Sequence, residues 1–117
     1  MKIETRFIQA LNREIPYIVG TDAQDNFDII DESEPTDMWF HISKCSSCHV
    51  IAKMPQDIKV DKKQKQQIIK QGALICKHNS KYKSARSVDV IYTLLSNITK
   101  TDILGQVEVI NAKYIEV

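Results

Sequence analysis

The sequence predicts a single α+β domain in which a mostly antiparallel sheet is combined with two helices. Three observations lead to this fold class. Short segments of alternating apolar and polar residues, typical of half-buried strands, occur towards both ends of the chain. One long segment near the middle repeats its apolar residues with the period of a helix. The length of 117 residues is enough for one packed core, so the domain is expected to cover residues 1–117.

The first third of the chain predicts a β-hairpin followed by a helix. Residues 5–10 and 17–19 are candidate strands, and Gly20 ends the second of them. A helix is expected from residue 21 or 22 to about residue 33, because either polar side chain can cap it and acidic residues follow in its first turn. Pro35 then ends this helix.

The segment that follows predicts two strands joined by a turn. In MWFHI, residues 38–42, the alternation places Trp39 and His41 on one face and the remaining side chains on the other. HVIA, residues 49–52, is the second strand, and SKCSSC between them is the turn. The two histidines are therefore expected on neighbouring strands.

The strongest helix prediction covers residues 61–79, and three strands are expected to close the sheet. One stripe of the helix is apolar or small while lysines and glutamines fill much of the rest. The stripe consists of Ile68, Ile69, Gly72, Ile75, Cys76 and Asn79. The closing strands are predicted at residues 88–92, 106–110 and 114–117.

Charge is distributed unevenly along the chain, although the formal net charge is only +1. Residues 1–37 contain nine acidic and three basic residues, whereas residues 53–86 contain ten Lys or Arg and two Asp. A basic face attracts polyanions through phosphate neutralisation, without regard to their sequence. A lysine-rich helix that is simply solvated is the alternative interpretation.

The sequence contains no address to another compartment. The first 20 residues are interrupted by charges, and no stretch reaches the roughly 18 consecutive apolar residues of a membrane span. Three cysteines, an odd number, are typical of a reducing environment. We expect a cytoplasmic protein, with the nucleus as a second location, and no membrane partner.

CSSCH at residues 45–49 matches the five-letter pattern of covalent haem attachment. Such attachment requires export, and no export signal precedes the pattern. Zinc is an alternative, with Cys45, Cys48 and Cys76 as ligands and His78 as the fourth. However, Cys76 and His78 lie two apart on a predicted helix and point in different directions. We therefore expect no metal and no cofactor, with Cys76 as a small core residue.

A wider window resembles the NFACT RNA-binding (NFACT-R) domain family. The resemblance runs through YIVGTDAQDNFDIIDESEPTDMWFHISKCSSCHVIAKMP and continues in ALICKHNS, VDVIYT, SNITKT and GQVEV, so that it covers about residues 5–117. The matching positions in the first window are Gly20, Ala23, Asn26, Asp37, Trp39, Phe40, His41, Ser47, His49 and Val50. SNITKT, which resembles the family's lysine-bearing turn, and GQV are most similar to a small eukaryotic branch whose coiled-coil tail this sequence does not contain.

The resemblance implies a nucleic-acid-binding module without catalytic residues. In large multidomain relatives, which recruit tRNA at stalled large ribosomal subunits, this domain is an expected RNA contact. We therefore expect tRNA or rRNA as partner, with DNA as a second candidate and the ribosome as a further partner, in translation or ribosome-associated quality control. No small-molecule substrate and no cofactor are predicted. Thr21 stands where many relatives have Arg, which removes one expected positive charge.

The predicted binding residues are those whose groups suit phosphate, sugar or base contacts. They are His41, Lys44, Ser46, Ser47, His49, Lys53, Tyr82, Asn97 and Lys100. Tyr82 lies between two lysines and is the expected stacking residue, whereas Trp39 is expected in the core. For His41, a purely structural role in the strand is the alternative.

Two other functions remain open at this point. One is an adaptor that binds protein through the acidic N-terminal third. The other is a hydrolase or transferase that uses His41, His49 and Asp37, which would need these groups within hydrogen-bond reach in a cleft.

Overall fold

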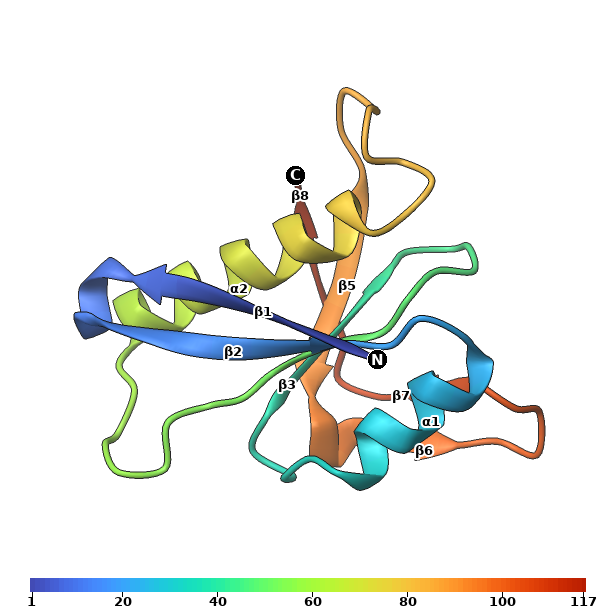
Figure 1. Cartoon of the computed structure of the whole chain (residues 1–117), viewed down its shortest axis with the longest axis horizontal. Helices are drawn as coiled ribbons and strands as arrows, with labels where there is room; N and C mark the ends of the chain where they lie inside the picture. The colour runs from blue at the N-terminus through green and yellow to red at the C-terminus, as the bar shows by residue number, and fades with distance from the viewer.

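The computed structural model describes all residues from Met1 to Val117. It contains eight strands and two α-helices (Figure 1). The strands are β1 (Lys2–Ile8), β2 (Arg13–Val19), β3 (Met38–Ile42), β4 (Val50–Ala52), β5 (Asp89–Leu94), β6 (Ile98–Lys100), β7 (Val107–Val109) and β8 (Lys113–Glu116). The helices are α1 (Ala23–Asp31) and α2 (Lys62–His78). The predicted α+β class is confirmed.

Six strands form one antiparallel sheet in the order β1-β2-β4-β3-β5-β8, and β6 pairs only with β7. The strand predicted at residues 106–110 is present as β7, but the expectation that it joins the main sheet is wrong. The expectation of a turn at SNITKT is also wrong, because Ile98–Lys100 form β6 opposite β7. Ile98, Val107 and Val109 pack together against the apolar cluster around Trp39, and this burial holds the small hairpin in place.

The predicted N-terminal hairpin is correct in place but not in length. β1 begins at Lys2 and pairs residue by residue with β2, and a 3-10 turn at Gln9–Leu11 replaces the end of the predicted first strand. The sequence KIETR alternates charged and uncharged residues as an edge strand does. Another small difference is His49, which precedes β4 and does not begin it.

The α2 helix covers one face of the sheet. Met38, Phe40 and Ile42 of β3 belong to the same buried cluster as the apolar stripe of α2. The approach is close at Gly72, where an added Cβ would lie 2.3 Å from Cζ of Phe40. Asp61 accepts a hydrogen bond from the backbone N–H of Gln64, whose side chain accepts one from the Asp61 N–H in return, so a capping box begins the helix.

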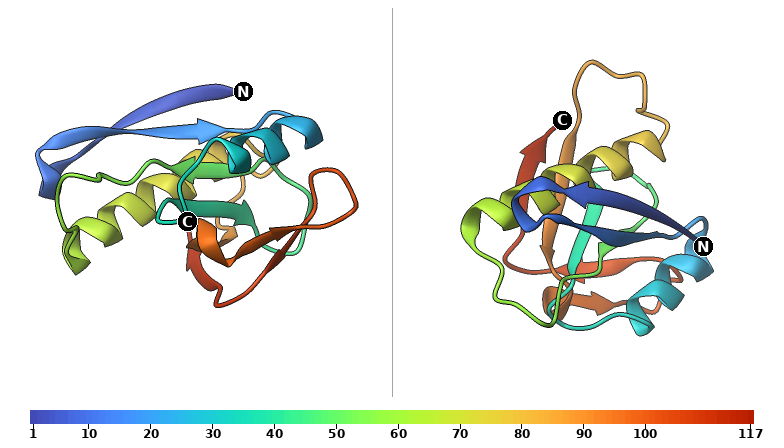
Figure 2. Two further views of the ribbon diagram at one scale, coloured as in Figure 1. Left: turned by 90° about the horizontal axis from the view of Figure 1, so that it is seen from below. Right: turned by 60° about the vertical axis from the view of Figure 1, so that its left-hand side comes forward.

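The opposite face carries α1 and the β6–β7 hairpin, which lie apart from α2 in the right-hand view of Figure 2. Ile18, Ile29, Trp39, Ile51 and Leu95 form a second buried cluster on this face. Trp39 and Phe40 therefore point to opposite sides of β3, as the alternation in MWFHI predicts. Asp22 caps α1 by accepting from the N–H of Asp25. None of the helices combines the length and apolar character that crossing a membrane requires.

Candidate nucleic-acid interface

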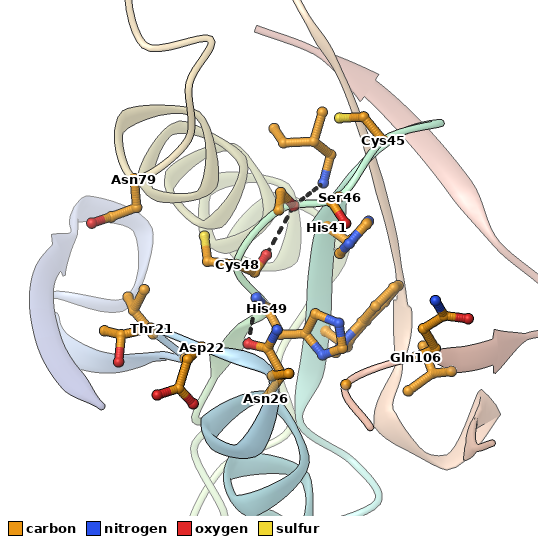
Figure 3. A pocket seen from close by; sticks show the side chains of 18 of the residues that line it. Thr21, Asp22, Asn26, His41, Cys45, Ser46, Cys48, His49, Asn79 and Gln106 are labelled. Carbon is orange, nitrogen blue, oxygen red and sulfur yellow. Dashed lines mark hydrogen bonds between the residues drawn. The ribbon is translucent and has the colours of Figure 1, made fainter. Parts of the chain in front are cut away.

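A pocket of about 850 Å³ opens on the face that α1 and the β6–β7 hairpin only partly cover. It lies between the start of α1, the loop at residues 43–49 and the turn at residues 104–106, and Figure 3 shows its side chains. Trp39, His41 and His49 are among its lining residues. The pocket thus forms where three connecting segments meet over the centre of the sheet.

The three aromatic side chains in the pocket pack against one another. The rings of Trp39 and His41 are parallel within 5°, with centroids 5.6 Å apart. The His49 ring meets both edge-on, with its centroid 5.2 Å from each. Trp39 and His49 are buried, at 1% and 2% exposure, whereas His41 is half-buried. The predicted core position of Trp39 is confirmed.

The backbone of His49 is held by residues at the start of α1. Its N–H donates to Oδ1 of Asn26 at 3.0 Å, and its carbonyl accepts from the N–H of Gly20 at 2.9 Å (Figure 3 shows the bond to Asn26). An added Cβ at Gly20 would lie 2.2 Å from that same Oδ1 of Asn26. A larger residue at position 20 would therefore displace the amide that positions His49.

Ser47 and Lys44 shape the loop that joins β3 to β4. The N–H of Ile42 donates to Oγ of Ser47, which in turn donates to the carbonyl of Cys48. Lys44 adopts a left-handed backbone conformation with φ of 62°, and its side chain is exposed and forms no ion pair. Ser46 is exposed beside it. The loop thus presents one free cation and one free hydroxyl at the pocket.

Both histidines of the pocket are neutral near neutral pH. Burial, with a smaller contribution from His41, lowers the pKa of His49 to about 3. Burial also lowers the pKa of His41. Two buried nitrogens have no hydrogen-bond partner, Nε1 of Trp39 and Nδ1 of His49. The ring cluster beneath the pocket therefore contains two buried, uncharged polar groups that the fold itself leaves unpaired.

The structure brings together five of the nine predicted binding residues. His41, Lys44, Ser46, Ser47 and His49 all line the pocket.

Lys53, Lys100, Asn97 and Tyr82 lie outside the pocket. Lys53 forms an ion pair with the buried Asp37 at 2.7 Å, and Lys100 pairs with Asp31 of α1. Asn97 donates to Oγ1 of Thr93. Tyr82 packs partly against the core, with Nζ of Lys81 5.4 Å from its ring centre. These four side chains are thus engaged with the rest of the protein.

Several lining residues were missed by reasoning from the sequence. One wall is formed by Leu104, Gly105 and Gln106, and Lys2 and Thr21 lie on the other side. An added Cβ at Gly105, which has φ of +81°, would lie 2.9 Å from Cα of Ala23. The glycine in GQV was the available signal, since only a small residue allows the turn to approach α1.

The alternative chemistries do not assemble in this geometry. Asp37 accepts from the backbone N–H groups of Glu34 and Met54 and pairs with Lys53, so it is not a partner of the histidines. No group of three His, Cys, Asp or Glu side chains could hold a metal ion. Cys76 is fully buried in the core, as predicted.

The charged segments lie on different parts of the fold. Most lysines of residues 53–86 lie on α2 and its flanking loops, whereas many acids of the first third lie on α1 and its flanks. The cations that line the pocket are Lys2, which forms an ion pair with Glu4 at 3.7 Å, and Lys44, which forms none.

Comparison with known families decides the assignment. The model of the NFACT protein RNA binding domain matches residues 5–109. The chain belongs to the NFACT RNA-binding domain family. The resemblance inferred from the residues is thus confirmed, and the motif positions Gly20, Asn26 and His49 meet in one contact at the pocket of this NFACT-R domain.

Known proteins extend the comparison. The chain is 32% identical over 83 residues to coiled-coil domain-containing protein 25 of Danio rerio and 34% identical over 88 residues to that of Mus musculus. In each case 71% of this chain and 40% of the relative are covered, so the chain spans less than half of their length. The C-terminal part of the fibronectin/fibrinogen-binding protein from Streptococcus suis has the same fold, with a TM-score of 0.79, 18% identity, and coverage of all of this chain and 45% of that chain.

Proposed function

We propose that this NFACT-R domain is a non-catalytic RNA-binding module that holds RNA at the pocket, mainly through phosphate and ribose contacts. The observation that carries the proposal is the convergence of His41, Lys44, Ser46, Ser47 and His49 on one pocket in a domain of an RNA-binding family. A free lysine, hydroxyl groups and exposed backbone suit phosphate and 2′-OH recognition, which fixes a nucleic acid without reading its sequence.

The electrostatics of the domain support this mode of binding. Lys44 is exposed and unpaired, so its charge is available to a phosphate. The lysines of α2 lie on the other face of the sheet and contribute to the attraction of a polyanion at longer range. Such binding weakens as salt rises, because counterions released from the RNA drive it.

As a finer proposal, the RNA is tRNA or rRNA and the protein acts in the cytoplasm, at or near the ribosome. It rests on the resemblance to multidomain members of the family that recruit tRNA at stalled large subunits.

The test is the binding of fluorescently labelled tRNA to the protein across a series of salt concentrations. Lys44→Gln should weaken binding and reduce the magnitude of the slope of log K against log salt by about 1, since one phosphate contact is lost. Lys65→Gln is the matched control, because Lys65 is an exposed lysine of α2 that also forms no ion pair. It should leave the slope nearly unchanged. Equal losses in the two variants would place the RNA elsewhere, and the absence of binding at low salt would refute the function.

A further inference from the structure

We propose that the pocket takes up one unstacked nucleobase of single-stranded RNA, held between the ring cluster of Trp39, His41 and His49 and the turn at residues 104–106. This inference rests on the proposed function and deepens it, since it adds a base-binding subsite to backbone contacts. The partner class that follows is single-stranded or looped RNA, as opposed to a regular duplex whose bases are paired and stacked.

The first step of the argument is the pair of unsatisfied nitrogens. Nε1 of Trp39 and Nδ1 of His49 are buried without a hydrogen-bond partner, in side chains that are 1% and 2% exposed. Buried polar groups in folded proteins nearly always have partners. Both side chains line the pocket. Both nitrogens are inaccessible in the unliganded fold, so a ligand in the pocket can supply the missing partners only when the ring cluster shifts to expose them.

The second step is the charge and shape of the floor. The rings of Trp39 and His41 lie parallel, and the low pKa values of His41 and His49 leave the floor uncharged at neutral pH. A phosphate would find no cation there. A nucleobase matches such a floor because it is a flat, neutral heterocycle with donors and acceptors along its edge, and because bases stack on aromatic side chains.

The third step is the position of the charged groups relative to this floor. Lys2 and Lys44 line the pocket with exposed side chains, so that a phosphate attached to the inserted nucleoside has cations available near the opening. The volume of about 850 Å³ is within the usual range for small-molecule sites and exceeds the needs of a single base. The ribose is therefore also accommodated.

Trp39 supplies a direct readout because it is the only tryptophan of the chain. In ¹H–¹⁵N spectra of the whole protein, uridine and adenosine monophosphates should shift the indole N–H resonance of Trp39. Ribose 5-phosphate, which has the same phosphate without a base, should leave that resonance in place. A response to both compounds alike, or to neither, would overturn the inference.

Affinity measurements distinguish binding of a base in the pocket from binding of the RNA backbone alone. Octauridylate should bind about tenfold or more tightly than an eight-residue abasic oligomer of equal charge, which corresponds to the contribution of one stacked base. His41→Ala should reduce the affinity for octauridylate by a larger factor than the affinity for the abasic oligomer. Lys44→Gln should weaken both oligomers by the same factor.

The outcomes distinguish the two proposals. Equal binding of both oligomers, with an unmoved Trp39 resonance, would overturn base insertion and leave backbone binding in place. If neither oligomer nor tRNA binds at low salt, the proposed function falls together with this inference. Backbone amide resonances of α2, which lies away from the His41 ring, at their wild-type positions in free His41→Ala show that the variant is folded, and His41→Gln is the substitute if it is not.

Discussion

The side chain of His49 is buried and uncharged at neutral pH, and its backbone is fixed by a hydrogen bond. Its ring packs edge-on against Trp39 and His41, and its N–H is held by Asn26. An imidazole in the unfolded chain titrates near 6.5, whereas burial and the neighbouring His41 lower the pKa of His49 in the folded protein to about 3. The unfolded state therefore binds a proton at a higher pH than the folded state does.

The pH dependence of stability follows from this difference. Because the unfolded state binds more protons between pH 6.5 and 3, the free energy of unfolding falls as the pH decreases through this range, by roughly 1.4 kcal/mol per unit for His49. We predict that the free energy of unfolding of His49→Phe, which keeps an aromatic ring, falls by roughly 2.5 kcal/mol less than that of the wild type between pH 7 and pH 4.5. Urea unfolding at the two pH values measures this difference.

The acidic groups provide an internal control for this measurement. Asp25 and Asp57 have pKa values below their ordinary range, so both proteins lose stability as these carboxylates are protonated in acid. That contribution cancels in the comparison of variant with wild type. Identical pH profiles for the two proteins would show that His49 does not titrate as inferred.

At the scale of elements, the packing of α2 on β3 decides how closely helix and sheet approach. Gly72 faces the ring of Phe40, which is fully buried. A glycine within a helix costs helix propensity relative to alanine, by about 1 kcal/mol. Glycine is required at position 72 because α2 lies so close to β3 that an added Cβ would be 2.3 Å from the Phe40 ring.

We predict that Gly72→Ala destabilises the protein by about 1–2 kcal/mol, although alanine is the better helix former, because overpacking outweighs propensity. Equilibrium urea unfolding gives the value. Phe40→Leu should cost less in the Gly72→Ala background than in the wild type, since the smaller side chain relieves the contact. Gln66→Ala, at an exposed position of the same helix, should change stability by less than about 0.5 kcal/mol. A more stable Gly72→Ala protein would contradict the packing argument.

At the scale of the whole molecule, two buried clusters lie on opposite faces of the same strands. Trp39 and Ile51 belong to the cluster on the pocket face, whereas Phe40 and Val50, their chain neighbours, belong to the cluster under α2. Both clusters are built on β3 and β4. If one cluster loses its packing, these strands are no longer held in place, and the other cluster loses its packing too. The pocket is therefore expected to be as stable as the fold itself.

We predict a single cooperative unfolding transition. Fluorescence of Trp39 reports on the pocket face and far-ultraviolet circular dichroism reports largely on α2, and the two signals should have the same urea midpoint, as two-state behaviour requires. A Trp39 transition at clearly lower urea would show that the pocket face unfolds separately. In that case the ring cluster would not be held rigidly for a ligand.

Features that depend on residues close together in the sequence were predicted correctly, whereas features that depend on contacts between distant segments were missed. The helix at residues 61–79 and the two-sided pattern of MWFHI were predicted because periodicity and capping are local properties. β6 was missed because a three-residue strand is defined by its partner β7. Lys53 was grouped with the binding residues from its charge, and Lys100 from its charge and its place in SNITKT, whereas ion pairs join them to Asp37 and Asp31.

The sequence by itself determined the α+β class, the family, the face on which Trp39 and His41 lie, and five residues that line the pocket. Each of these depends on spacing along the chain or on a motif within it. Only the tertiary structure decided that the turn around Gly105 closes against Ala23 and that Trp39 and His49 retain unsatisfied nitrogens beneath it. These features depend on contacts between segments far apart in the chain, which are set by strand order and packing and leave no periodic signal in the sequence.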